Sequence, residues 1–168
     1  MKILIILYPL FCFASSPCIC QTPDATRSPV TWGEAERVAF IRQIGLNNLA
    51  TILQTGAAEE QTSQAHIVQY LTENRAAIDD HGSDNTVTIL QYGMFQDADI
   101  KLEGDGNFEN ILQQGLGNTF LMNSSVDDAT GVYSQHGREN MLKINKRDGV
   151  SVPVEIHQIG NGIQMIIE

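Results

Sequence analysis

The chain has 168 residues, of which 42% are hydrophobic and 18% charged, so it is long enough for one ordinary folded domain and does not have the composition of a disordered protein. Its formal net charge is −10, from 20 acidic and 10 basic residues. That balance argues against nucleic acid or an anionic membrane surface as a partner, because both are bound through basic patches.

The first residues have the pattern of an export signal. Lys2 precedes an apolar run over residues 3–14, which has the length of a signal-peptide core and is too short to span a bilayer as a helix. We therefore expect a signal peptide over residues 1–20, cut after Cys20 or, alternatively, after Ser16. The competing interpretation is a buried N-terminal strand.

All three cysteines, Cys12, Cys18 and Cys20, lie in this segment, and a chain cut after Cys20 would contain no disulfide. A lipoprotein signal is a further alternative, but the residues before Cys18 and Cys20 fit it poorly. No later stretch is long and apolar enough for a membrane span. Residues 21–37 contain two prolines and show no period, which predicts a flexible leader.

A repeat begins at Val38 and continues to the end of the chain. Its template is Ala/Val-x-Ile-x-Gln-x-Gly-x-x-Asn, and most steps are 11 residues long, with four extra residues between Gln54 and Gln69 and one between Lys146 and Gln158. A fixed period of this kind indicates stacked repeats. The glycines that we assign to turns are Gly45, Gly56, Gly82, Gly93, Gly104, Gly115, Gly137 and Gly160.

Apolar residues lie four and two positions before the glutamine in most units, as Ala65 and Ile67 do before Gln69. This period of two predicts a strand with one buried face, and Gly-x-x-Asn predicts a tight turn after it. Two units then form a 22-residue rung. We expect residues 38–168 to be an all-β solenoid with two parallel, in-register sheets, in which stacking pairs each backbone with the next rung.

The inward glutamines need partners, because an unpaired buried amide is costly. In a stack each amide can bond the same glutamine one rung away. Sorting alternate units gives one complete column, Gln43, Gln69, Gln91, Gln113, Gln135 and Gln158, and one degenerate column, Gln54, Asp80, Leu102, Ser124 and Lys146. The substitutes Asp80, Leu102, Ser124 and Lys146 are either gatekeepers that slow assembly or the result of drift.

The pattern Gln-x-Gly-x-x-Asn-x-Ala-x-x-x-Gln, which is complete from Gln43 to Gln54 and partly repeated from Gln113 and Gln135, resembles the curlin repeat. The resemblance covers roughly residues 38–168. It implies a secreted subunit of an extracellular amyloid fibre on a Gram-negative bacterium, whose leader directs export through an outer-membrane pore. It also implies that templated assembly is driven by ladders of Gln43, Gln54, Gln69, Gln91, Gln113, Gln135, Gln158, Asn48, Asn74, Asn85, Asn107, Asn118 and Asn140.

Some units depart from that pattern. Leu71, Val126 and Asp148 replace glycine, and Glu59, Gln96, Ala129 and Ser151 replace asparagine. These departures leave open whether the chain is a major subunit or a minor, nucleating one. The partners implied by the resemblance are further copies of the chain, other curlin subunits, and the secretion pore with its accessory factors.

Assembly through open solenoid ends is the function that we expect, because an uncapped edge can template another chain. The alternative is a soluble secreted solenoid that acts as an adhesin or binds carbohydrate. Enzymatic activity, a metal site and a cofactor are not expected, because the carboxylates are scattered and the histidines do not converge. The histidines are His66, His81, His136 and His157.

Overall fold

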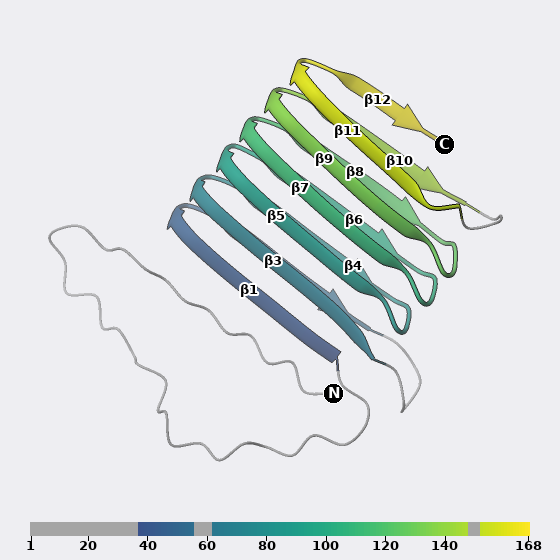
Figure 1. Cartoon of the computed structure of the whole chain (residues 1–168). Coiled ribbons are helices and arrows are strands. Elements are labelled where there is room, and N and C mark those ends of the chain that lie inside the picture. The colour runs from purple at the N-terminus through teal and green to yellow at the C-terminus, as the bar shows by residue number, and fades with distance from the viewer. Residues whose placement is uncertain (1–36, 56–61, 148–151) are drawn as a thin grey trace, which may run out of the picture.

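The computed structural model describes residues 37–55, 62–147 and 152–168, and these ranges form twelve β-strands and no helix (Figure 1). The predicted signal peptide, the predicted leader except Arg37, and Gly56 lie outside the described residues. Those expectations therefore stay predictions. In the described part of the chain, no helix has the length and apolarity that a membrane span requires.

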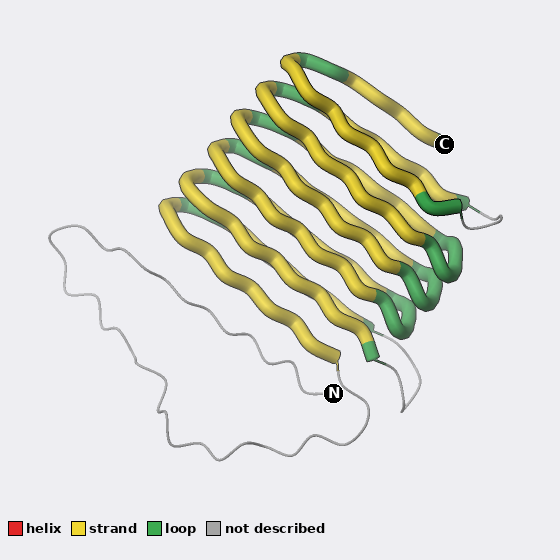
Figure 2. Tube along the Cα trace, in the orientation of Figure 1, coloured by secondary structure: helices red, strands yellow, loops and turns green. Residues whose placement is uncertain are grey.

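Long and short strands alternate along the chain (Figure 2). The odd-numbered strands form one parallel sheet, here the first sheet: β1 (Arg37–Leu46), β3 (Ser63–Thr72), β5 (Thr86–Met94), β7 (Phe108–Leu116), β9 (Thr130–Arg138) and β11 (Val154–Asn161). The even-numbered strands form the second sheet: β2 (Leu49–Gln54), β4 (Arg75–Asp80), β6 (Asp97–Leu102), β8 (Thr119–Ser124), β10 (Met141–Lys146) and β12 (Gln164–Ile167). The expected all-β solenoid with two parallel sheets is confirmed.

Like residues meet like across the strands of each sheet. Gln69 pairs with Gln43 on one side and with Gln91 on the other, and Ile67 is flanked in the same way by two isoleucines. The offset between rungs is 22 residues in the middle of the stack, 26 at the first step and 23 at the last. The extra residues of the first and last steps fall in or beside the ranges 56–61 and 148–151, which the structure does not describe.

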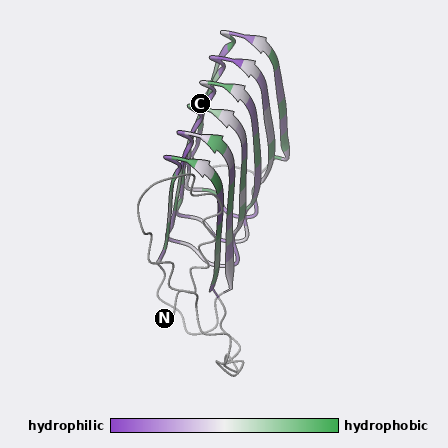
Figure 3. Cartoon of the chain, turned by 90° about the vertical axis from the view of Figure 1, so that its left-hand side faces the viewer, coloured by the Kyte–Doolittle hydropathy of each residue, from purple (hydrophilic) through white to green (hydrophobic). Residues whose placement is uncertain are grey.

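The core lies between the two sheets and is narrow, because each strand contributes only its inward side chains. In β3 the inward residues Ala65, Ile67 and Gln69 are buried, whereas the alternating residues His66 and Val68 are partly exposed. This is the period of two that the sequence predicts. Figure 3 shows the rungs from the side, stacked over one another along one axis.

The glycines that follow the glutamines differ from expectation. Five of them, Gly45, Gly93, Gly115, Gly137 and Gly160, lie inside the odd strands rather than in the turns, with φ between 123° and 142°. An added Cβ at Gly115 would come within 1.9 Å of the carbonyl oxygen of Gly137 in the next rung. Glycine is therefore needed for the close stacking of backbones. Gly82 and Gly104 do lie in turns, as predicted.

Candidate functional site

The complete glutamine column is a continuous chain of hydrogen bonds inside the first sheet. In each rung the side-chain Nε2 donates to the Oε1 of the glutamine in the next rung. The Nε2 to Oε1 distances lie between 2.7 and 2.9 Å along Gln43, Gln69, Gln91, Gln113, Gln135 and Gln158. The column predicted from the sequence is present in full.

The second amide hydrogen of these glutamines is also bound. Gln91 Nε2 donates to the carbonyl oxygen of Arg75 at 2.8 Å, and Gln113 Nε2 to that of Asp97 at 2.9 Å, each at the start of a strand in the second sheet. Equivalent bonds occur at three further rungs. Each such glutamine thereby links its neighbouring rung and the opposite sheet, which is why a buried amide is tolerated here.

The column has a direction. All five bonds run from the rung nearer the N-terminus to the rung nearer the C-terminus. Among the described residues, no donor reaches the Oε1 of Gln43, whereas Gln158 uses one amide hydrogen on the carbonyl oxygen of Met141 at 3.0 Å and has a second to give. One end of the column therefore offers an acceptor and the other end a donor.

Asparagines occupy the first arc, which we define as the turns from each odd strand to the next even strand. Asn74 Nδ2 donates to the carbonyl oxygens of Tyr70 and Gly93, both at 2.8 Å. Asn48, Asn118 and Asn140 make bonds of the same kind, to backbone rather than to one another's side chains. In this arc the amide side chains therefore bond to the backbone of their own and the next rung, and not to one another.

Gln96 stands where the repeat expects asparagine and donates to the equivalent backbone carbonyls. Its Nε2 donates to the carbonyl oxygens of Tyr92 at 2.9 Å and Gly115 at 3.2 Å. Its backbone N–H donates to the Oδ1 of Asn74 at 3.2 Å. Its buried Oε1 has no partner in the described part of the chain, so the column is interrupted between Gln96 and Asn118.

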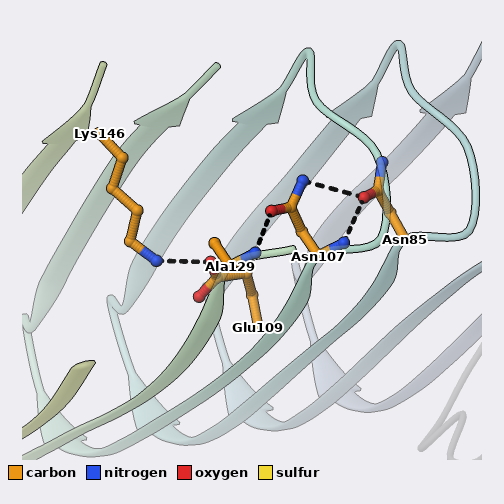
Figure 4. A network of polar contacts seen from close by, with 5 residues as sticks. All are labelled: Asn85, Asn107, Glu109, Ala129 and Lys146. Atoms are coloured by element: carbon orange, nitrogen blue, oxygen red, sulfur yellow. Dashed lines mark hydrogen bonds and ion pairs between the residues drawn. The ribbon is translucent and has the colours of Figure 1, made fainter. Parts of the chain in front are cut away.

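The second arc, from each even strand to the next odd strand, contains a shorter column (Figure 4). The backbone N–H of Asn107 donates to the Oδ1 of Asn85 at 2.9 Å, and the N–H of Ala129 donates to the Oδ1 of Asn107 at 2.8 Å. The methyl side chain of Ala129 has no oxygen that could accept a hydrogen bond from the backbone N–H of the next rung. This column ends where the sequence replaces asparagine with alanine.

The degenerate column is in register, as expected, but its members have different environments. Gln54, Asp80, Leu102, Ser124 and Lys146 pair successively across the second sheet. Asp80 is buried and accepts hydrogen bonds from Asn85 Nδ2 at 2.7 Å and from the N–H of Gly82 at 3.1 Å. Ser124 is buried, and its Oγ has no partner in the described part of the chain.

Lys146 crosses the core and forms an ion pair that the sequence reasoning missed. Its Nζ lies 2.7 Å from Oε1 of Glu109, whose side chain is fully buried in β7 (Figure 4). Burial raises the pKa of Glu109 above its ordinary value, and the attraction of Lys146 only partly opposes this. The pair joins the first sheet to the second across the core.

Two residues of β9 shape the space around this pair. Tyr133 lies in the isoleucine column, packs on Phe120 with ring centroids 5.1 Å apart, and has its pKa raised by burial and by the Glu109 carboxylate. An added Cβ at Gly131 would lie 1.9 Å from Glu109 Oε2 and 2.2 Å from the Tyr133 hydroxyl oxygen. Gly131 therefore leaves the room that Glu109 and Tyr133 fill.

A signal for this cluster exists in the sequence. The units before Gln113 and Gln135 place Glu109 and Gly131 at a position that is alanine or valine in most other units. A buried carboxylate is costly unless a cation pairs with it. Lys146 is the cation at an inward position of the degenerate column. What the repeat period does not give is which inward residue faces which across the core.

The histidines do not converge. His81 follows β4 of the second sheet, and its Nε2 lies 2.9 Å from Oδ1 of Asp79. His136 lies in β9 of the first sheet. Across the described ranges, no group of three or more histidine, cysteine or acidic side chains has the arrangement of a metal site.

Comparisons of the chain with protein-family models, with curated proteins and with solved structures gave no match. The fold and the columns define its class. It is a parallel, two-sheet β-solenoid with an in-register column of hydrogen-bonded glutamines.

Proposed function

We propose that this chain is an exported subunit of a curli-like amyloid fibre, which grows when copies stack end to end along the solenoid axis. The observation that carries this proposal is the directional glutamine column, which ends in an acceptor at Gln43 and a donor at Gln158. An end-to-end stack satisfies both with the same bond that joins the internal rungs.

The backbone edges support the same arrangement. The outermost strands are β1 and β2 at one end of the two sheets and β11 and β12 at the other. In the described ranges no strand pairs with their outer sides, so each end presents a row of backbone donors and acceptors. Such an edge is a template for a strand of another chain.

The core columns continue across this junction. Suppose that β11 of one copy lies beside β1 of the next in the register of the internal rungs. Gln158 then lies beside Gln43, Ile156 beside Ile41 and Val154 beside Ala39. In the second sheet, Ile167 of β12 would likewise meet Ile52 of β2. The junction therefore repeats the chemistry of the interior.

The same proposal places the chain outside a Gram-negative cell, released through an outer-membrane pore and its accessory factors, with further copies and other curlin subunits as partners. The degenerate second column and the irregular step lengths favour a minor or nucleating subunit over a major one, because they weaken the repetition on which regular growth depends.

Fibre formation by the purified chain tests the proposal. We expect fibres with a meridional reflection at about 4.7–4.8 Å, binding of an amyloid dye, and a lag phase that preformed fibres shorten. A chain that stays monomeric for days, without dye binding, would contradict it. Adding a small proportion of the chain to a curlin major subunit then separates the roles, since a nucleator shortens the lag of the major subunit.

A further inference from the structure

The outer face of the first sheet, here face A, consists of the outward side chains of its six strands. Its centre is an apolar stripe in which Val68, Leu90 and Leu112 align on successive rungs. Beside the stripe, the rings of Tyr70 and Tyr92 stack with centroids 4.5 Å apart and an interplanar angle of 2°. Face A is thus a flat, ordered surface with an apolar centre and mostly uncharged polar residues around it.

Face A is also nearly free of charge. In β3, β5 and β7, no outward position carries Asp, Glu, Lys or Arg, and in β9 the last residue, Arg138, is the charged outward residue. The charged residues of face A within the described ranges are Arg42 in β1, Arg138 at the end of β9 and Glu155 in β11. Arg42 and Glu155 stand at opposite ends of the stack and have opposite signs.

The rest of the described surface differs. The outward side of the second sheet carries six charged residues: Arg75, Asp79, Asp97, Asp99, Lys101 and Lys143. The arcs carry acidic residues, among them Asp84, Asp105, Asp127 and Glu139. Two copies of a chain with a net charge of −10 repel one another where these acidic arcs approach. The six charges of the second sheet sum to zero, but face A has fewer charged residues, so two copies that meet through face A remove fewer charges from water.

We infer that face A binds face A of a second copy, with the stacking order of the two copies opposed. A two-fold axis parallel to the strands, between β5 and β7, places β1 of each copy opposite β11 of the other. Arg42 of one copy then approaches the rung that carries Glu155 of its partner, twice per pair, and Leu90 of each copy packs against Leu112 of the other. This isologous contact is a lateral one, distinct from the end-to-end junction.

A carbohydrate is a weaker match to face A, because sugar rings pack on exposed flat aromatic faces. The Tyr70 and Tyr92 rings cover each other's faces and present their edges outward, and the Arg42 guanidinium lies 6.0 Å from the Tyr70 ring centroid. An apolar stripe with interdigitating ring edges instead suits the dry interface between two paired sheets.

The test compares two lysine substitutions at partly exposed leucines, Leu90→Lys on face A and Leu121→Lys on the outer side of the second sheet. Mass per unit length of the fibres is measured by electron microscopy. We expect two chains per axial repeat of about 29 Å for the wild type and for Leu121→Lys, and one chain for Leu90→Lys. One chain per repeat in the wild type, or the same loss in both variants, would overturn the inference.

A charge exchange checks the orientation without altering the stripe. Arg42→Glu should shift the fibres to one chain per repeat, and Arg42→Glu combined with Glu155→Arg should return them to two. A single variant that stays paired, or a double variant that stays unpaired, would refute the opposed arrangement.

This inference rests on the proposed function only for its fibre measurement. If the chain forms no fibres, sedimentation of the soluble wild type and of Leu90→Lys gives the answer. A wild-type dimer with a monomeric Leu90→Lys would support the face A contact while refuting the fibre proposal, and a wild-type monomer would refute both.

Discussion

At the scale of single residues, two equally buried polar side chains, Gln113 of the first sheet and Ser124 of the second, differ in their hydrogen bonds. Gln113 Nε2 donates to Gln135 Oε1 and to the carbonyl oxygens of Asp97 and Asn118, all at 2.9–3.1 Å. Ser124, equally buried, has an Oγ without a partner in the described ranges. The free energy of the fold therefore depends on Gln113 far more than on Ser124.

Gln113→Leu should accordingly destabilise the chain and slow its elongation. It leaves one amide hydrogen of Gln91 and the Oε1 of Gln135 without a partner inside the core, at a cost of about 1–3 kcal/mol for each. Ser124→Ala is the matched control and should be neutral or slightly stabilising. Urea midpoints and seeded elongation rates measure both effects. Equal effects would contradict the division into a complete and a degenerate column.

The Lys146 ion pair changes what a restored repeat should do. If Lys146 is a gatekeeper, Lys146→Gln should shorten the lag phase. In the structure the same change leaves the Glu109 carboxylate buried and unpaired, which costs about 3–5 kcal/mol. We therefore expect Lys146→Gln to lower the urea midpoint, and Lys146→Gln with Glu109→Gln to recover most of it. A single variant as stable as the wild type would show that the pair contributes nothing.

The raised pKa of Glu109 predicts a pH dependence of stability. Because folding raises this pKa above its ordinary value of about 4.5, the folded chain binds the proton more tightly than the unfolded chain. The protonated Glu109 carboxyl therefore adds to the free energy of unfolding. This contribution is fully present below about pH 4.5 and is lost as the pH rises through the raised pKa of Glu109. The groups that face Glu109 are Lys146 of β10 and the Tyr133 hydroxyl of β9.

Urea midpoints measured from pH 4.5 to 8 for the wild type and for Glu109→Gln isolate this contribution. Both chains keep Asp97, whose pKa burial also raises, so the difference between their curves belongs to Glu109. We expect the wild-type midpoint to fall more steeply with rising pH. Parallel curves would contradict the assignment.

At the scale of the elements, the strands are longer than the sequence pattern predicts because they continue through glycine. The prediction placed Gly115 in a turn, since glycine is the usual residue for irregular backbone. Its place inside β7 follows from the neighbouring rung, whose carbonyl at Gly137 occupies the space of a side chain. Leu71 is an exception that holds φ at 78° at the same point of its rung.

Two nearby glycines therefore should respond differently to the same substitution. Gly115→Ala places a Cβ 1.9 Å from the backbone of the next rung and should disrupt stacking. Gly117→Ala places a Cβ no closer than 3.7 Å to Glu139 and should cost only the strain of its positive φ, about 1–2 kcal/mol. Thermal or urea unfolding compares the two variants. A Gly115→Ala chain as stable as Gly117→Ala would contradict the close-approach explanation.

The alternation of apolar residues and the spacing of glutamines were enough to predict the sheets, their register and the complete column, because these depend only on which residue lies above which. The Glu109, Tyr133 and Lys146 cluster could not be predicted in the same way. Its members belong to different strands of opposite sheets, and their contact depends on how the two sheets face each other. A repeat period carries no information on that pairing.

At the scale of the whole molecule, the stack has a polarity that a cross-linking experiment can detect. In the proposed junction, Ile159 of β11 lies beside Ile44 of β1 in the next copy, one residue after the paired Gln158 and Gln43. Both side chains point outward, and Ile159 is 75% exposed, so cysteine at either site should not disturb the core.

Ile44→Cys and Ile159→Cys chains, each with its native cysteines replaced by serine, are assembled separately and as an equal mixture, then oxidised. In the mixture, paired strands about 4.8 Å apart bring the two Cα atoms within disulfide range, so cross-linked dimers should form. Fibres of either variant alone should give none, because like ends never meet in a head-to-tail stack. Dimers in the single-variant fibres would mean that the rungs join head to head and that the direction of the amide column does not set the direction of growth.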